Sequence, residues 1–132
     1  MMISTRGRYA LRVMLDLAEH SGSGYVPMKE VAERQELSLK NIERIMPDLT
    51  RGGCVEGQHG KGGGYRLARK PEEYPLGEIL RLTEGSLAPV ACLEEGAAPC
   101  AHPCPSLPVW EKLEQLVAEY LDSVTLADLL PK

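Results

Sequence analysis

The stretch PMKEVAERQELSLKNIERIM, residues 27–46, contains two short apolar patterns separated by a turn. The first pattern predicts a short helix after Pro27, with Val31 and Ala32 facing inward. Ser38 is a suitable N-cap for a second helix. Its expected buried stripe consists of Leu39, Ile42, Ile45 and Met46. Two short helices joined in this way indicate a helix-turn-helix, although a generic helical hairpin has the same spacing.

The opposite face of the second helix is polar. It carries Lys40, Asn41, Glu43 and Arg44. In a helix-turn-helix, the second helix usually enters the major groove of DNA. Pro47 lies further along the same helix and has no backbone N–H, so we expect it to kink the helix or to end it one turn early.

A glycine-rich segment, GGCVEGQHGKGGGYRLAR, follows at residues 52–69. CVEGQ and GYRLA are short strand candidates on either side of the tip HGKGGG. A two-stranded ribbon after a helix-turn-helix is typical of a winged helix, and its tip would offer His59, Lys61 and backbone N–H groups to a groove or a phosphate. A nucleotide-phosphate loop is disfavoured, because GKGGGY lacks the Walker spacing and no acidic metal ligand follows it.

Helical spacing also appears on both sides of this region. Apolar residues recur at three- and four-residue intervals from Ser4 to about His20, and a short helix is predicted over about residues 76–82. A longer stripe consists of Leu107, Trp110, Leu113, Leu116, Val117, Tyr120 and Leu121. It predicts a helix near residues 107–123, and Thr125 can cap a final helix in TLADLL. We expect the long helix both to pack on its own domain and to pair with a second copy of the chain.

Length and composition favour one mainly α-helical domain with a small β-wing. The chain has 132 residues, of which 43% are hydrophobic and 26% are charged. No apolar run approaches the roughly 18 residues that a membrane span needs, and we expect a cytoplasmic protein. Residues 1–70 are predicted to form a winged helix-turn-helix domain. Residues 71–132 would supply a linker helix, a cysteine-containing loop at 91–106 and a dimerisation helix.

Charge is distributed unevenly along the chain. Residues 1–70 carry 12 Lys/Arg and 8 Asp/Glu, a net charge of +4, whereas residues 71–132 carry 3 Lys/Arg and 11 Asp/Glu, a net charge of −8. A basic half can face nucleic-acid phosphates while an acidic half stays away from them. An accidental arrangement of solvated helix faces would give the same split, so the charge alone does not decide the function.

Three of the four cysteines, Cys92, Cys100 and Cys104, lie in ACLEEGAAPCAHPCPSLPVW, together with His102. Disulfides are disfavoured in the cytoplasm. Three thiols within thirteen positions could converge on one metal or iron–sulfur cluster. Alternatively, the thiols could be oxidised reversibly, or the loop could have no sensing role. Cys54, beside the first wing strand, is predicted to be a small buried residue.

The whole chain resembles the Rrf-type family of bacterial winged-helix transcriptional regulators. The segments that carry the resemblance are ISTRGRYALRVMLDLA, VPMKEVAERQELSLKNIERIM, GKGGGYRL, LGEILRLTEG and TLADLL. The family includes regulators of iron–sulfur-cluster assembly, of the response to nitric oxide and of cysteine metabolism. The resemblance implies a homodimer that binds a roughly palindromic double-stranded DNA operator, mostly as a repressor, with the helix at residues 107–123 at the dimer interface.

The resemblance also implies roles for particular residues. Positions that match DNA contacts of the family are Ser38, Lys40, Asn41, Glu43, Arg44, His59 and Lys61, with His59 where relatives commonly have an arginine. A second group, Arg6, Arg8, Lys29 and Arg51, is expected to contact phosphates or to be solvated. Cluster-binding branches carry three cysteines in the loop before the dimer helix, which here are Cys92, Cys100 and Cys104. Relatives place a fourth ligand at positions occupied here by Leu107 or Arg8, so His102 is the nearby candidate.

Two hypotheses about the regulation therefore stay open. In the first, an iron–sulfur cluster or the redox state of the thiols in the Cys92–Cys104 loop controls DNA binding. In the second, the regulator has no cluster and acts in cysteine or sulfur metabolism, and its effector is a small metabolite or a partner protein such as a cysteine-biosynthesis enzyme. An enzyme is disfavoured, because no Ser/His/Asp set or carboxylate pair is recognisable and the three histidines are far apart in the sequence.

Overall fold

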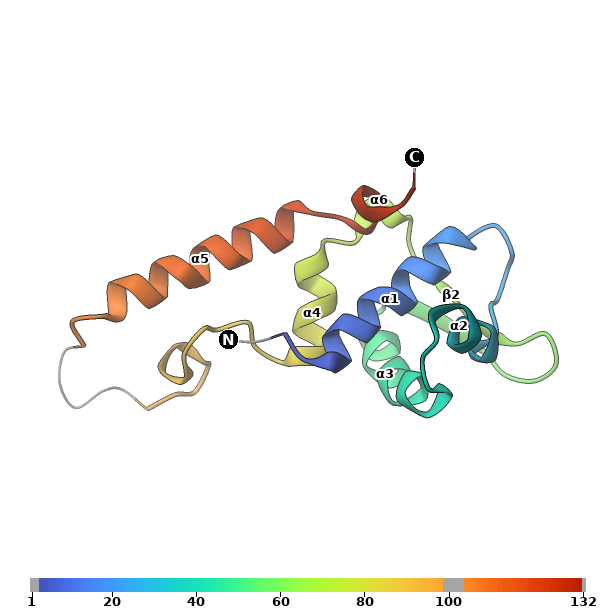
Figure 1. The fold of residues 1–132 in the computed structure, drawn as a ribbon, viewed down its shortest axis with the longest axis horizontal. Coiled ribbons are helices and arrows are strands. Elements are labelled where there is room, and N and C mark those ends of the chain that lie inside the picture. The colour runs from blue at the N-terminus through green and yellow to red at the C-terminus, as the bar shows by residue number, and fades with distance from the viewer. Residues whose placement is uncertain (1–2, 99–103, 132) are drawn as a thin grey trace.

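The computed structural model describes residues 3–98 and 104–131 of the chain. In order, the elements are α1 (Thr5–Glu19), α2 (Met28–Gln35), α3 (Leu39–Arg51), β1 (Val55–Gln58), β2 (Gly64–Leu67), η1 (Pro71–Glu73), α4 (Leu76–Glu84), η2 (Ala91–Leu93), α5 (Leu107–Ser123) and α6 (Leu126–Leu129). Helices thus dominate the fold and a two-stranded antiparallel sheet accompanies them, as the sequence predicts (Figure 1). None of the helices described is long and apolar enough to cross a membrane.

Helix α1 crosses the centre of the body and forms one side of the core. Ser4 caps its first turn, because its hydroxyl accepts a hydrogen bond of 3.1 Å from the backbone N–H of Gly7. The buried face of α1 includes Ala10, Val13, Met14, Leu17 and Ala18. This is the face that the three- and four-residue spacing predicts.

Helices α2 and α3 form the predicted helix-turn-helix. Glu36 ends α2 in a left-handed conformation (φ 54°), and the Ser38 hydroxyl caps α3 by accepting a hydrogen bond of 3.2 Å from Asn41 N–H. The predicted stripe is confirmed at Ile42, Ile45 and Met46, which are buried. The prediction was wrong for Leu39, the first residue of α3, which is 38% exposed. Leu37 in the turn packs against the core instead.

Of the two expectations for Pro47, an early end of α3 was wrong, and a kink stays a prediction. Helix α3 continues through Pro47 to Arg51. Leu49, one turn beyond the early end that was expected, is fully buried. Its burial stabilises the last turn of α3, which continues beyond the proline.

Strands β1 and β2 pair antiparallel with Val55 opposite Leu67 and Gln58 opposite Gly64. Strand β2 of this wing is attached to the segment before α2, because Val26 and Tyr65 exchange two backbone hydrogen bonds of 2.8 and 2.9 Å. Gly64 makes the close approach possible. Its φ is +147°, and a Cβ atom there would lie 2.2 Å from the Val26 carbonyl oxygen.

The core also includes residues that follow the wing. Tyr74, Ile79 and Leu126 are fully buried and belong to the same cluster as the apolar faces of α1 to α3. The Tyr74 hydroxyl donates a hydrogen bond of 2.7 Å to the Cys54 carbonyl and accepts one of 2.8 Å from Arg69 N–H. Helices α4 and α6 therefore complete the core of the winged-helix region, while the functional division at residue 70 stays a prediction.

Helix α5 spans the predicted residues, Leu107–Ser123, but none of its residues is buried. It extends as an arm from the body, and the wing lies at the opposite end of the molecule (Figure 1). Its carboxyl end is attached to the body, because Asp122 pairs with Arg81 of α4 at 2.8 Å and the Val124 carbonyl accepts a hydrogen bond of 2.8 Å from Leu76 N–H. The Thr125 cap of α6 is confirmed: its hydroxyl accepts from Asp128 N–H.

Candidate nucleic-acid interface and cysteine loop

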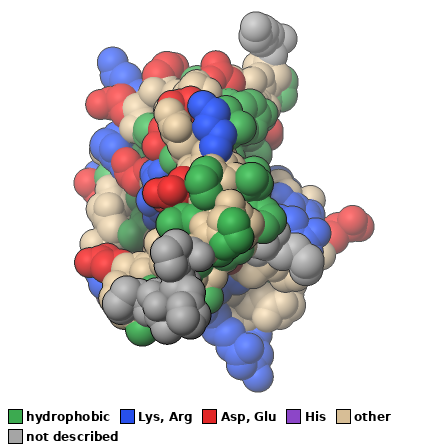
Figure 2. Space-filling model, turned by 90° about the vertical axis from the view of Figure 1, so that its left-hand side faces the viewer, with side chains coloured by type: hydrophobic (Ala, Val, Ile, Leu, Met, Phe, Trp, Pro, Cys, Tyr) green, Lys and Arg blue, Asp and Glu red, His purple; other side chains and the backbone are tan. Residues whose placement is uncertain are grey.

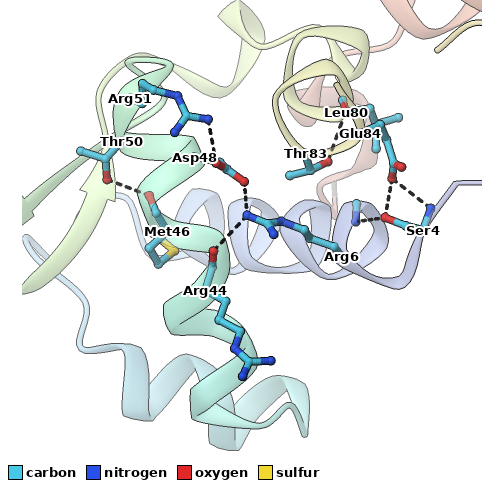
Figure 3. Close-up of polar contacts among 11 residues, drawn as sticks. Ser4, Arg6, Arg44, Met46, Asp48, Thr50, Arg51, Leu80, Thr83 and Glu84 are labelled. Carbon is cyan, nitrogen blue, oxygen red and sulfur yellow. Dashed lines mark hydrogen bonds and ion pairs between the residues drawn. The ribbon is translucent and has the colours of Figure 1, made fainter. Parts of the chain in front are cut away.

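The outer face of α3 is polar and exposed along its first two turns. Lys40, Asn41, Glu43 and Arg44 are exposed, while the buried residues of the same helix hold it against the core. Figure 3 shows the Arg44 guanidinium lying away from the Arg6 guanidinium and the Asp48 carboxylate. The structure thus places these four predicted contact residues together on one accessible surface.

The cations of this surface differ from most arginines of the chain in having no acidic partner. Six arginines form ion pairs with carboxylates: Arg6, Arg34, Arg51, Arg66, Arg69 and Arg81. Within residues 3–98 and 104–131, Lys40 and Arg44 of α3 and Lys61 of the wing have none. Charged groups left free in this way can pair with phosphates without first breaking an ion pair.

Ser38 has a structural role, because its hydroxyl is the cap of α3. A second lone pair of the hydroxyl oxygen and its hydrogen stay available for an additional contact. Ser38 is exposed and lies at the amino end of the helix, beside Lys40 and Asn41. The cap therefore does not conflict with the predicted DNA contact, which stays a prediction.

The wing tip carries the other two predicted contact residues. His59 and Lys61 are exposed and lie between β1 and β2. Gly60 and Gly62 have positive φ angles of 90° and 80°, which glycine adopts without strain. These glycines let the tip turn sharply, and both side chains project from a short, accessible loop.

The two cysteines of the loop that the structure describes have free thiols. Cys92 lies in η2 and is exposed, whereas Cys104 is partly exposed and lies three residues before α5. The Cys104 sulfur is 3.2 Å from the Ser106 hydroxyl. Hydrogen bonding by Ser106, first through its side chain and then through its backbone, lowers the pKa of Cys104 below its ordinary value. Because the thiolate is the reactive and metal-binding form, Cys104 is suited to such chemistry.

The full predicted ligand set is not assembled in the described part of the chain. Cys100 and His102 lie outside the described residues. Among residues 3–98 and 104–131, no three His, Cys, Asp or Glu side chains converge on a metal-sized site. Leu107 is the first residue of α5, and Arg8 donates a hydrogen bond of 3.0 Å to the Thr5 hydroxyl, so neither position offers a ligand.

The remaining cysteine is in a different environment. Cys54 is fully buried, as the sequence predicts, and its thiol donates a long hydrogen bond of 3.5 Å to Glu78. Burial and then the negative charge of Glu78 raise the pKa of Cys54 to about 11. A thiol that is buried and protonated is chemically inert, so Cys54 is separate from the loop cysteines.

Helix α5 leaves apolar side chains uncovered in the single chain. Val109, Leu113, Leu116 and Tyr120 are between 38% and 67% exposed. Viewed from the α5 end, the molecule shows hydrophobic side chains gathered across the middle of this face (Figure 2). Two shallow grooves follow the helix, one lined by Val109, Leu113 and Leu116 and the other by Leu116, Tyr120 and Ile3. A continuous apolar surface of this kind marks an interaction site.

Two ion-pair sets that the sequence analysis missed support the helix-turn-helix. Asp16 of α1 is 2% exposed and accepts hydrogen bonds of 2.7 and 3.0 Å from the Arg34 guanidinium of α2. Burial alone would raise the pKa of Asp16, but hydrogen bonds from Arg34 and Gln35 lower it below the ordinary value. In the second set, Arg6 and Arg51 both bind Asp48 of α3. The spacing within one helix could have indicated the pair of Asp48 with Arg51, but no sequence signal connects residues of different helices.

A helix-turn-helix with an attached two-stranded wing, an outward polar recognition helix and free cations defines a DNA-binding protein of the winged-helix class. A model of the Rrf2 family, described as an iron-dependent transcriptional regulator, matches residues 3–132. The chain belongs to the Rrf2 family of winged-helix transcriptional regulators. Members of this family regulate transcription and are not enzymes.

Individual relatives agree with this assignment. The chain is 32% identical over 130 residues to the HTH-type transcriptional regulator IscR of Aliivibrio salmonicida. This alignment covers 98% of the chain and 77% of the relative. The structure of CymR, the global cysteine regulator of B. subtilis, is similar with a TM-score of 0.82 and 34% identity, covering 98% of this chain and 95% of CymR. The structure of T. potens IscR is similar with a TM-score of 0.78 and 37% identity, and the match covers 98% of this chain and 85% of that structure.

Proposed function

We propose that this chain is a homodimeric repressor that binds a roughly palindromic operator through α3 and the wing. We propose further that the thiols of the Cys92–Cys104 loop control its DNA binding. The observation that carries the proposal is the outer face of α3, where exposed polar side chains surround cations that have no acidic partner among the residues that the structure describes.

The chemistry of this face fits the reading of DNA. Lys40, Arg44 and Lys61 can neutralise phosphates, which supplies affinity that depends on salt concentration. Asn41 and Arg44 can make paired hydrogen bonds to adenine and guanine edges in the major groove, and Glu43 can accept a hydrogen bond from cytosine. Phosphate contacts would fix the position of α3, and the base contacts would select the sequence.

The uncovered face of α5 supports the homodimer. A second copy of α5 would cover Leu113, Leu116 and Tyr120 and remove their apolar surface from water, at about 25 cal/mol per Å². Two copies related by a twofold axis would present two α3 helices to two half-sites of a palindrome.

An iron–sulfur cluster is the first candidate for the ligand of the loop thiols. Cys92 and Cys104 are accessible and free, and the pKa of Cys104 is lowered, so the described donors fit iron. Cys100 would complete the three thiolates and His102 is the candidate fourth ligand. The description of the family model as iron-dependent agrees with this choice. When bound, the cluster would supply one-electron redox chemistry or sensitivity to oxidants.

A second candidate is a regulator of cysteine or sulfur metabolism that has no cluster. Two observations favour it: neither Leu107 nor Arg8 can act as a fourth ligand, and the fold resembles that of a global cysteine regulator. In this case the loop thiols would be oxidised reversibly, or a metabolite or a partner enzyme would bind the regulator.

Gel-shift titrations test the DNA assignment. The probe is a duplex that the wild-type chain enriches from a randomised library. We expect Lys40→Ala and Arg44→Ala each to weaken binding about tenfold without changing the oligomeric state, consistent with the loss of a phosphate or base contact. Lys70→Ala removes the same charge at the base of the wing and serves as the control. Unchanged affinity of both α3 variants would overturn the assignment.

Purification without oxygen, followed by an absorption spectrum and analysis of iron and acid-labile sulfide, separates the two candidates for the ligand. A cluster predicts visible absorption together with iron and sulfide, all lost in Cys92→Ala and Cys104→Ala. A colourless protein without iron that still binds the selected duplex would instead support the regulator without a cluster.

A further inference from the structure

Helix α3 contains a weak turn at Pro47. The proline has no N–H, so the Glu43 carbonyl loses its partner within the helix, and the proline ring crowds that carbonyl. Kinks in helices occur at such places. Lys40 and Arg44, which face DNA in the proposed function, precede the weak turn, whereas the buried Leu49 follows it.

Arg6 of α1 spans this turn. Its guanidinium donates a hydrogen bond of 3.1 Å to the Arg44 carbonyl, before Pro47, and a second one to the carboxylate of Asp48, after Pro47 (Figure 3). One side chain from a different helix thus connects the two sides of the proline. Planar guanidinium groups suit such a double contact, because their N–H donors have a fixed geometry.

Asp48 is held as a charged partner. Burial alone would raise its pKa, but hydrogen bonds from Arg51 and Arg6 lower the pKa of Asp48 below the ordinary value. The carboxylate of Asp48 is only 14% exposed, and Arg51 binds its other oxygen at 2.7 Å. The ion pair between Arg6 and Asp48 therefore persists through the neutral pH range.

The first turn of α1, which carries Arg6, is held by hydrogen bonds to α4. The backbone N–H and the hydroxyl of Ser4 both donate to Glu84 at the end of α4, at 2.9 and 2.7 Å. Gly7 leaves space for this carboxylate, since a Cβ atom there would lie 2.3 Å from the Glu84 oxygen. Contacts with two other helices thus surround the first turn of α1: α3 through Arg6 and α4 through Ser4.

We propose that Arg6 is a positioning residue for the recognition helix, which it holds straight across Pro47, and that Glu84 fixes the turn from which Arg6 acts. The proposal rests on the proposed function, in which α3 reads DNA. Arg6 would set the direction of the Lys40 and Arg44 side chains without touching DNA itself.

A different role for Arg6 would be a direct phosphate contact. A cleft of about 250 Å³ lies between α1 and α3, and its lining includes both Arg6 and Arg44. The two roles make opposite predictions for Asp48→Asn. If Arg6 contacts a phosphate, the loss of a nearby negative charge strengthens DNA binding. If Arg6 positions α3, the loss of its charged partner weakens binding.

Fluorescence anisotropy with the selected duplex over a series of KCl concentrations separates the two roles. We expect Arg6→Gln and Asp48→Asn each to weaken binding about fivefold to tenfold, the size typical of an indirect effect. The slope of log affinity against log salt should stay that of wild type, whereas a lost phosphate contact would reduce it by about 0.9. Arg81→Gln breaks an exposed ion pair between α4 and α5 and should bind DNA like wild type.

Pro47→Ala gives the second test, because it restores the missing N–H of α3. Arg6→Gln should weaken binding much less in the Pro47→Ala background than in wild type, since the helix no longer needs the external support. The proposal is overturned if Asp48→Asn binds as tightly as wild type or more tightly, if Arg6→Gln reduces the salt slope, or if Pro47→Ala leaves the effect of Arg6→Gln unchanged. Lys40→Ala and Arg44→Ala separate the two levels: if both variants bind normally, the proposed function itself fails.

Discussion

Helices α3 and α5 both carry apolar residues at helical spacing, but residues 3–98 and 104–131 bury only the stripe of α3. Ile42, Ile45 and Met46 of α3 are at most 2% exposed, whereas Leu116 and Tyr120 of α5 are at least 50% exposed. The polar face of α3 is thereby turned outward by the chain's own core. For α5 the described residues leave the apolar face exposed, and the proposed dimer would cover it. The same periodicity thus has two uses, and only the packing distinguishes them.

The largest expected effect is on the stability of the folded chain. Ile45→Ala should lower the free energy of unfolding by about 2–5 kcal/mol, because it creates a cavity in the core. The matched variant Leu113→Ala should change the stability of the monomer by less than about 1 kcal/mol. Urea denaturation at several protein concentrations measures both. The loss in Ile45→Ala should not depend on concentration, whereas an effect of Leu113→Ala should grow with it.

The cysteines offer a second comparison between the covered and the uncovered region. In protein treated with a chelator, iodoacetamide should modify Cys92 and Cys104 on the order of a hundredfold faster than Cys54, because Cys54 is buried and its pKa is raised to about 11. Mass spectrometry of the native protein follows the reaction, and denaturant should make the rates similar. Rapid modification of native Cys54 would contradict the assignment of this thiol to the core.

A charged substitution on the uncovered face of α5 tests whether this face forms the dimer. Leu116→Asp should raise the dissociation constant of the dimer by about a hundredfold, because it places a charge in the apolar centre of the interface. Gln115→Glu changes the charge of the neighbouring exposed residue and serves as the control. Sedimentation equilibrium measures both variants. Undiminished self-association of Leu116→Asp would show that this face does not form the dimer.

The smallest effect is expected for the ion pair that attaches α5 to the body. Asp122→Asn should change stability by less than about 1 kcal/mol, because the pair with Arg81 is exposed. In contrast, hydrogen bonds to the buried Asp16 lower its pKa below the ordinary value of 3.8. The ionised Asp16 therefore stabilises the fold at pH values above 3.8, and this contribution is lost as the pH falls through the lowered pKa. Acid denaturation of the Asp122→Asn variant should therefore show the same loss of stability at low pH as wild type.

The sequence was sufficient to predict most of the fold. Ser38 as a cap, the stripe of Ile42 to Met46 and the glycine-rich wing are local signals, and the structure confirms them. The local pattern was wrong about the burial of Leu39 and about an early end of α3 at Pro47. Packing decided both outcomes: Leu37 is the residue that packs against the core near this turn, and Leu49 is buried beyond the proline.

The candidate site was less accessible from the sequence. The outward face of α3 follows from periodicity, so its polar residues could be named in advance. The contacts that fix α3 could not be predicted, because their partners are far apart in the sequence and meet only after folding. Arg6 and Asp48 are 42 residues apart, and Ser4 and Glu84 are 80 residues apart. The sequence did not distinguish the arginines that are paired within the chain from the cations that are free for DNA.

The control of DNA binding by the loop thiols is tested most directly by one comparison. Affinity for the selected duplex is measured for protein prepared without oxygen, before and after a defined oxidant, in wild type and in the Cys92→Ala, Cys100→Ala and Cys104→Ala variants. We predict that oxidation changes the affinity of wild type and that the variants lose this response while keeping the fold. Variants that bind and respond to the oxidant as wild type does would contradict the role of the loop.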